Sequence, residues 1–125
     1  MIRYSYNQQI QPPAPFVIIR LVNAADGRAF ENVPAQVDHG ADRSVLPSNL
    51  VDDLGLAQMG VAEIGGLGGK VQELPTYVVL VGIHDLPPRP CKVLSCHEPW
   101  VLLGRDILND HRILLDGPQV SLEIG

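Results

Sequence analysis

Glycine and proline recur at short intervals along the whole chain, which contains 12 glycines and 11 prolines among its 125 residues. Neither residue is favoured inside helices, and both are frequent in turns. The stretches between them are short and rich in Val, Ile and Leu, a pattern typical of strands joined by turns. The sequence therefore predicts a mainly β fold with many brief strands.

The turn residues also predict the limits of the individual elements. The pair Asp26-Gly27 suits a tight hairpin turn, and Gly55 suits the end of a short helix that begins near Pro47. A second short helix is expected over residues 106–109. Strands are expected at residues 15–23, 29–38, 44–46, 57–64, 71–83, 91–95, 100–103, 113–115 and 120–124, with a proline-rich loop at 86–90.

Length and composition indicate one compact domain. A chain of 125 residues has the size of a single domain, which we assign to residues 14–125, with residues 1–13 as an N-terminal extension or arm. The net charge is -5 and the nine basic residues are scattered, which argues against a nucleic-acid partner. The longest apolar runs, at 16–19 and 78–81, are far too short to cross a membrane.

The N-terminus and the cysteines bear on the cellular compartment. Residues 1–10 lack the apolar stretch of a secretory signal, so we expect a cytoplasmic protein. Cys91 and Cys96 are too few for a disulfide framework and are expected to be free thiols. A zinc site formed by these cysteines with His97 and His84 is a weaker alternative, because the spacing matches no common ligand pattern. We therefore expect no metal and no cofactor.

The most informative stretch is residues 34–47, Pro-Ala-Gln-Val-Asp-His-Gly-Ala-Asp-Arg-Ser-Val-Leu-Pro. It resembles the active-site segment of the retroviral-type (retropepsin-like) aspartic proteases, in which a strand leads into Asp-Thr-Gly or Asp-Ser-Gly, followed by Ala. Asp38, Gly40, Ala41 and the Ser-Val-Leu run at 44–46 match this pattern. His39 stands where the family has Thr or Ser.

Two further segments match the same family in the expected order. Residues 101–108, Val-Leu-Leu-Gly-Arg-Asp-Ile-Leu, resemble the family's pair of hydrophobic residues followed by Gly-Arg and a short helix. Residues 64–70, Ile-Gly-Gly-Leu-Gly-Gly-Lys, lie where the family has its flap hairpin. Together the three segments extend the resemblance over about residues 16–116. A phosphate-binding loop at 64–70 is disfavoured, because the Lys is not followed by Ser or Thr and no helix pattern begins there.

The resemblance implies a single-domain closed β-barrel of the acid-protease type, with one or two short helices and a flap hairpin. It also implies that the strand at 120–124 takes part in a dimer interface. The implied site residues are Asp38 as the catalytic carboxylate; His39, Gly40 and Ala41 in the active-site loop; Leu102, Leu103 and Gly104 beneath that loop; Arg105 paired with Asp42 as support; and Gly65, Gly66, Leu67, Gly68 and Gly69 in the flap.

The chemistry of this family needs two carboxylates that share one proton. One takes a proton from water while the other donates to the peptide carbonyl, because like charges ~3 Å apart cannot both ionise. The chain contains a single Asp-x-Gly-Ala motif, at Asp38, and Asp116-Gly117 lacks the surrounding strand. We therefore expect a homodimeric endopeptidase that acts on peptide or protein substrates, with one Asp38 from each copy.

His39 leaves a second function open. A Thr or Ser hydroxyl locks the two active-site loops across the dimer axis in this family, whereas an imidazole is larger and can become charged. The alternative is a peptide-binding or dimerisation module that keeps the protease fold but is catalytically impaired. A third interpretation, in which Asp38 only caps its own turn, is disfavoured by the flanking matches.

Overall fold

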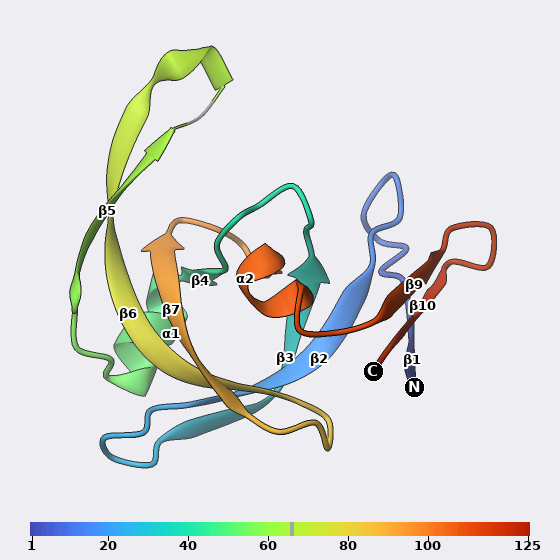
Figure 1. The fold of residues 1–125 in the computed structure, drawn as a ribbon, viewed down its shortest axis with the longest axis horizontal. Coiled ribbons are helices and arrows are strands. Elements are labelled where there is room, and N and C mark those ends of the chain that lie inside the picture. Colours follow the sequence, from blue (N-terminus) through green and yellow to red (C-terminus); the bar gives the residue numbers. More distant parts are fainter. Residues whose placement is uncertain (66) are drawn as a thin grey trace.

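The computed structural model describes residues 1–65 and 67–125, without the side chain of Leu67, and within them the chain forms two β-sheets and two short α-helices (Figure 1). The strands are β1 Ile2–Ser5, β2 Phe16–Val22, β3 Ala29–Val37, β4 Val45–Pro47, β5 Gly60–Gly65, β6 Val71–Ile83, β7 Arg89–Cys96, β8 Val101–Leu103, β9 Ile113–Asp116 and β10 Ser121–Ile124. The helices are α1 Ser48–Leu54 and α2 Arg105–Leu108. None of the described helices is long and apolar enough to cross a membrane.

The larger sheet closes into a barrel. Its strand order is β2-β3-β8-β4-β7-β6-β5, and an additional pairing of β2 with β6 joins its two sides. Residues 19–22 of β2 lie antiparallel to residues 80–83 of β6 at this closure. Six strands therefore form the barrel, and β5 lies outside it, against β6. This confirms the predicted mainly β closed-barrel fold.

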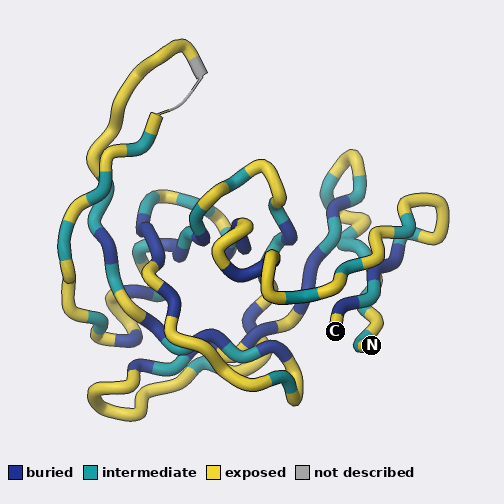
Figure 2. The backbone as a smooth tube through the Cα atoms, in the orientation of Figure 1, coloured by how far each residue is buried: buried dark blue, intermediate teal, exposed yellow. Residues whose placement is uncertain are grey.

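The core follows from the alternation of apolar and polar residues along the strands. In β2, Val17, Ile19 and Leu21 are buried while Ile18 and Arg20 are exposed, as expected for side chains that point to opposite faces in turn. Buried residues line the inside of the barrel in Figure 2. Burial of one Leu, Ile or Val stabilises the fold by about 1.5–3 kcal/mol. The fully buried large side chains are Val17, Ile19, Leu21, Leu46, Leu54, Val79, Val93, Val101, Leu103, Leu108, Leu122 and Ile124.

Some predicted element limits were wrong by a few residues. The strand expected at 57–64 begins at Gly60. β7 begins at Arg89, inside the expected loop at 86–90, because Arg89 and Pro90 lie opposite Val81 and Leu80 of β6. α2 begins one residue earlier than predicted, at Arg105, because the extended Gly104 ends the preceding strand segment (φ -90°, ψ -176°).

The two chain ends form the second sheet. Its order is β1-β10-β9, with β1 and β9 both antiparallel to β10. Ile2 and Tyr4 of β1 pack against the barrel core together with Ile113 of β9. Residues 1–13 thus contribute a strand to the structure, and both termini lie close together on the same side of the barrel in Figure 1.

Candidate active site

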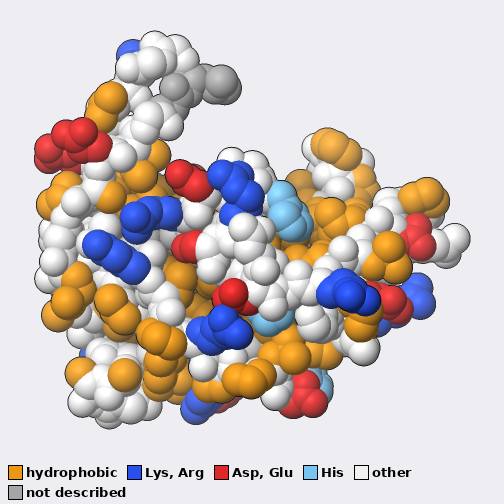
Figure 3. All heavy atoms as spheres, viewed as in Figure 1, with side chains coloured by type: hydrophobic (Ala, Val, Ile, Leu, Met, Phe, Trp, Pro, Cys, Tyr) orange, Lys and Arg blue, Asp and Glu red, His pale blue; other side chains and the backbone are white. Residues whose placement is uncertain are grey.

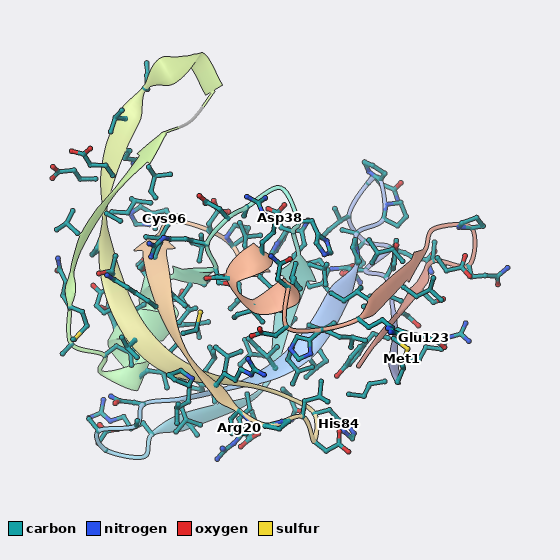
Figure 4. All side chains as sticks on the ribbon, in the orientation of Figure 1. Met1, Arg20, Asp38, His84, Cys96 and Glu123 are labelled. Carbon is teal, nitrogen blue, oxygen red and sulfur yellow. The ribbon has the colours of Figure 1, made fainter. Side chains whose placement is uncertain are left out.

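Asp38 is the first residue of the loop that follows β3, at one end of the barrel (Figure 4). Its N–H donates to the carbonyl oxygen of Leu103 (3.0 Å), and its own carbonyl accepts from the N–H of Ala41 (3.2 Å). The Asp38 Oδ1 atom accepts a hydrogen bond from the N–H of Gly40 (3.0 Å). A Cβ atom at position 40 would lie only 3.1 Å from that oxygen. The loop therefore fixes the carboxylate and leaves it partly exposed to an incoming group.

The strand β8 lies between β3 and β4 and so passes under the Asp38 loop. Gln36 and Val37 of β3 lie opposite Leu102 and Leu103 in parallel register, and Val45 of β4 lies opposite Leu102 from the other side. Hydrogen bonds from both neighbours hold β8 in place. Residues 34–47 and 101–105, which are distant in the sequence, are thus brought into one unit.

Gly104 lies where the turn after β8 touches the Asp38 loop. A Cβ atom there would lie 2.7 Å from the carbonyl carbon of Arg43 and 2.9 Å from the carbonyl oxygen of Ala41. The next residue, Arg105, donates its N–H to that same Ala41 oxygen (2.9 Å). Only glycine permits this approach, because any side chain would collide with main-chain atoms of the loop.

The strongest link between the loop and α2 was not predicted from the sequence. Asp106 accepts hydrogen bonds from the N–H of Ser44 (2.9 Å) and from the Ser44 hydroxyl (2.7 Å). The fully buried Ser44 Oγ in turn accepts from the N–H of Gly104 (3.0 Å). Both residues lie inside the segments that resemble the protease family, and the acidic residue in the first turn of α2 was the available signal. Asp106 and Ser44 therefore hold the loop, and neither is a candidate catalyst.

Cys91 lies next to this group and is not a reactive thiol. Its Sγ atom is 3.5 Å from Asp106 Oδ2, to which it can donate. Burial, followed by the nearby negative charge of Asp106, raises the pKa of Cys91 to about 12, so the reactive thiolate is scarce at neutral pH. The described residues contain no group of three His, Cys, Asp or Glu side chains positioned to hold a metal ion.

Arg105 has a different partner from the one predicted. Its Nη1 atom donates to the carbonyl oxygen of His39 (2.6 Å), and no ion pair with Asp42 is found in the described part of the chain. Asp42 is exposed, so its carboxylate keeps its contact with water. The predicted Arg105–Asp42 pair is corrected accordingly: within one protomer Arg105 supports the loop by binding a main-chain oxygen of it.

The His39 side chain lies at the exposed apex of the loop. Apart from the bond to its carbonyl, the described residues provide no hydrogen bond to it, and its imidazole is available to solvent or to a second molecule. Position 39 thus lies at the exposed end of the candidate site.

The glycine-rich segment forms the tip of a long hairpin. β5 and β6 are paired from Gly60↔Thr76 to Gly65↔Val71, and a short 3-10 turn at Leu67–Gly69 follows. Gly68 and Gly69 have φ values of 83° and 73°, which favour glycine. The predicted Gly66 lies outside the described residues. The hairpin extends beyond the barrel at the same end as the Asp38 loop (Figure 1).

Trp100 is a further residue beside the site, and the sequence assigned it no role. Its indole N–H donates to Gln36 Oε1 (2.7 Å), and its ring meets Phe16 edge-on with centroids 5.5 Å apart. Gln36 lies in β3, two residues before Asp38. Trp100 therefore packs against the part of β3 that leads into the Asp38 loop.

A comparison with solved structures agrees with this geometry. No model of a known protein family matches the chain, and no curated protein sequence matches it. Among solved structures, the chain is similar to EIAV protease in its complex with the inhibitor HBY-793, with 25% sequence identity and a TM-score of 0.60. The match covers 86% of this chain and 93% of that one. The chain therefore has the retropepsin-like fold of an aspartic protease.

Proposed function

We propose that the chain is one subunit of a homodimeric aspartic endopeptidase. The observation that supports this most directly is Asp38, which lies on an Asp-x-Gly-Ala loop with its carboxylate oriented by Gly40 and partly exposed. The loop rests on β8 and is bonded to α2 through Ser44 and Asp106. Such a support keeps a catalytic group in one geometry during the reaction.

The proposed reaction is the addition of water to a peptide carbonyl. Two Asp38 carboxylates, one from each copy, would share one proton; the ionised one takes a proton from water while the protonated one donates to the carbonyl oxygen. One protomer supplies only half of this pair, because its sequence has a single Asp-x-Gly-Ala motif. A two-fold dimer provides the second carboxylate with the same geometry.

We propose that the β5–β6 hairpin acts as a flap. Its paired strands keep their register up to Gly65 and Val71, while the glycines at its tip give it backbone freedom. Closure over an extended peptide would exclude water and allow strand-like hydrogen bonds to the substrate main chain. The substrate class is therefore a peptide or an unfolded protein segment.

A peptide-binding module without turnover is the second candidate, and position 39 favours it. An imidazole replaces the small hydroxyl side chain of the resembling family, and it lies exposed next to Asp38. A protonated His39 would stabilise the ionised form of the neighbouring carboxylate and hinder the sharing of one proton. Under this proposal the chain would bind peptides and dimerise but would not hydrolyse them.

Cleavage of a peptide library between pH 3 and 7 tests the first proposal. The wild type should cleave, and Asp38→Asn, which keeps the size of the side chain but removes its charge, should not. Asp53→Asn is the matched control, since Asp53 is exposed on α1, away from the Asp38 loop. Absence of cleavage by a demonstrably dimeric wild type, together with tight binding of a hydroxyl-containing peptide mimic, would support the binding module instead.

A further inference from the structure

A cavity of about 510 Å³ lies beside the base of the β5–β6 hairpin. Its walls come from three elements, which are the helix α1, the hairpin strand β6, and the end of β7 with the turn that follows it. Cys96 lines this cavity and lies between the hairpin and Asp38 in Figure 4. The cavity is therefore at the active-site end of the barrel, although no residue of the Asp38 loop lines it.

The charge of this cavity is negative. Two carboxylates line it, Asp52 of α1 and Glu98 of the turn after β7, and neither belongs to an ion pair in the described part of the chain. Among the described lining residues, only His97 can carry a positive charge. Glu98 is half-buried, so its carboxylate has lost part of its contact with water. A cation in the cavity would therefore meet negative charge that the protein leaves uncompensated.

The thiol of Cys96 shows that the charge of Glu98 reaches into the cavity. The Cys96 Sγ atom lies 4.0 Å from Glu98 Oε1. Burial, followed by the nearby negative charge of Glu98, raises the pKa of Cys96. A thiol is only a weak hydrogen-bond donor and does not neutralise a carboxylate. Glu98 thus keeps its charge available to a ligand.

Ser95 adds a buried polar group to the same cavity. It is 4% exposed and lines the cavity, and its hydroxyl takes part in none of the side-chain hydrogen bonds found among the described residues. Buried hydroxyls are usually hydrogen-bonded, because leaving one without a partner costs free energy. A ligand with N–H donors can supply the missing partner. Tyr77, which is half-buried on β6, lines the cavity as well and contributes an aromatic ring.

The hairpin beside the cavity is also acidic. Glu63 of β5 lies directly opposite Glu73 of β6, and both are exposed. Figure 3 shows acidic side chains on the stem of this hairpin. Like charges in such a pair destabilise the two strands. Glu73 lies between Gln72 and Leu74, which line the cavity, so its charge adds to a field that attracts cations from solution.

We propose that this cavity binds an arginine side chain of the peptide substrate. This inference rests on the proposed function, which gives the chain a peptide ligand at this end of the barrel. A guanidinium group has five N–H donors and no acceptor, so it matches the carboxylates of Asp52 and Glu98 and the hydroxyl of Ser95. Its planar face also stacks on an aromatic ring such as that of Tyr77. The enzyme would therefore select peptides that carry arginine close to the scissile bond.

The test compares peptides that differ only in arginine or citrulline, which is uncharged and nearly the same in shape. This residue is moved through the positions on each side of the scissile bond, and kcat/KM is measured for each peptide. At one position the wild type should prefer arginine by about fivefold or more. Glu98→Gln should reduce that preference to less than about twofold, and Asp52→Asn should reduce it in the same direction. The ratio of the two peptides within one variant cancels any general loss of activity.

Asp53→Asn is the matched control, because Asp53 follows Asp52 on α1 but does not line the cavity. It should keep the preference of the wild type. Glu98→Lys gives the reverse test, since it should prefer a glutamate peptide to the arginine peptide at the same position.

The outcomes separate this site from the proposed enzyme. A wild type that cleaves the arginine and citrulline peptides equally at every position would overturn the arginine site and leave the enzyme intact. A preference that survives in both Glu98→Gln and Asp52→Asn would overturn the site as well. If the wild type cleaves no peptide, the proposed enzyme fails, and equilibrium binding of the same peptides decides on the site: a preference for arginine that Glu98→Gln removes would support it, and equal binding would overturn it.

Discussion

Asp106 accepts two hydrogen bonds from Ser44, one from its N–H (2.9 Å) and one from its hydroxyl (2.7 Å). These residues are 62 positions apart in the sequence, and they join the loop after Asp38 to the first turn of α2. Ser44 is fully buried, so its polar groups have no access to water as an alternative partner. The carboxylate of Asp106 therefore helps to hold the end of the Asp38 loop against α2.

Removal of Asp106 should destabilise the protein. Asp106→Ala leaves the N–H and hydroxyl of Ser44 buried without their partner, which costs about 2–3 kcal/mol in the free energy of unfolding. Asp106→Asn should cost less, about 1 kcal/mol, because the amide can still accept one bond. Urea unfolding measures both. Asp110→Ala is the control, since its partner Arg89 is exposed and such pairs contribute little; equal losses in all three variants would contradict the assignment.

Gly104→Ala should be among the most damaging single changes in the chain. Its Cβ would lie 2.7 Å from the carbonyl carbon of Arg43, and the loop can move away only by giving up its bonds to β8 and α2. We expect a loss of about 3 kcal/mol in the free energy of unfolding. Gly117→Ala is a matched control, because a Cβ at position 117 would meet no atom within 4 Å. Similar stabilities of the two variants would argue against the tight contact.

The sequence motifs predicted where this site lies, but they did not predict the hydrogen bonds within it. β6 has the predicted limits, Val71–Ile83, because a long run of β-branched and apolar residues between turn signals defines them. Asp42 was wrongly predicted as the partner of Arg105, because a long flexible side chain can reach several acceptors and the sequence does not show which one it binds. The Ser44–Asp106 link depends on which strands become neighbours, which only the closed barrel determines.

The strands at the C-terminal end were predicted, but the N-terminal strand β1 was missed for a physical reason. Residues 2–6 alternate apolar and polar side chains over a very short stretch, and β1 is held in place by its pairing with β10 at the other end of the chain. A strand whose partner is more than a hundred residues away leaves no local signal of register. The dimer contact expected at residues 120–124 stays a prediction.

The buried thiol of Cys91 should make stability fall at alkaline pH. The folded-state pKa of Cys91, about 12, lies above its ordinary value of 9.0, so the folded protein holds this proton more tightly than the unfolded chain. The contribution of this thiol to the free energy of unfolding is complete below pH 9 and is lost as the pH rises from 9 towards 12. Between pH 8 and pH 10.5 the free energy of unfolding, measured with urea, should fall in the wild type by on the order of 1 kcal/mol more than in Cys91→Ala. Parallel pH profiles of the two proteins would contradict the shift.

Trp100 is the only tryptophan and should report peptide binding by its fluorescence. Its indole bonds to Gln36 of β3, two residues before Asp38. Titration of Asp38→Asn with an uncleaved peptide should shift the emission maximum, because a bound chain would exclude water from the indole. Trp100→Phe should bind the same peptide more weakly, by about three- to tenfold, through the loss of contact area and of the bond to Gln36. An emission unchanged at saturating peptide would place the binding surface elsewhere.

His39→Thr should raise turnover if the imidazole is what limits catalysis. A hydroxyl can donate and accept across a dimer axis without carrying charge, whereas an imidazole is larger and can become charged. We expect kcat to increase about tenfold at pH 4–5. His39→Asn is the matched control, since it is uncharged but lacks the hydroxyl; an equal gain in both variants would assign the defect to charge, and a gain in Thr alone would assign it to the missing hydroxyl. Loss of cleavage in both variants, with the dimer intact, would show instead that the imidazole has become part of the catalytic machinery.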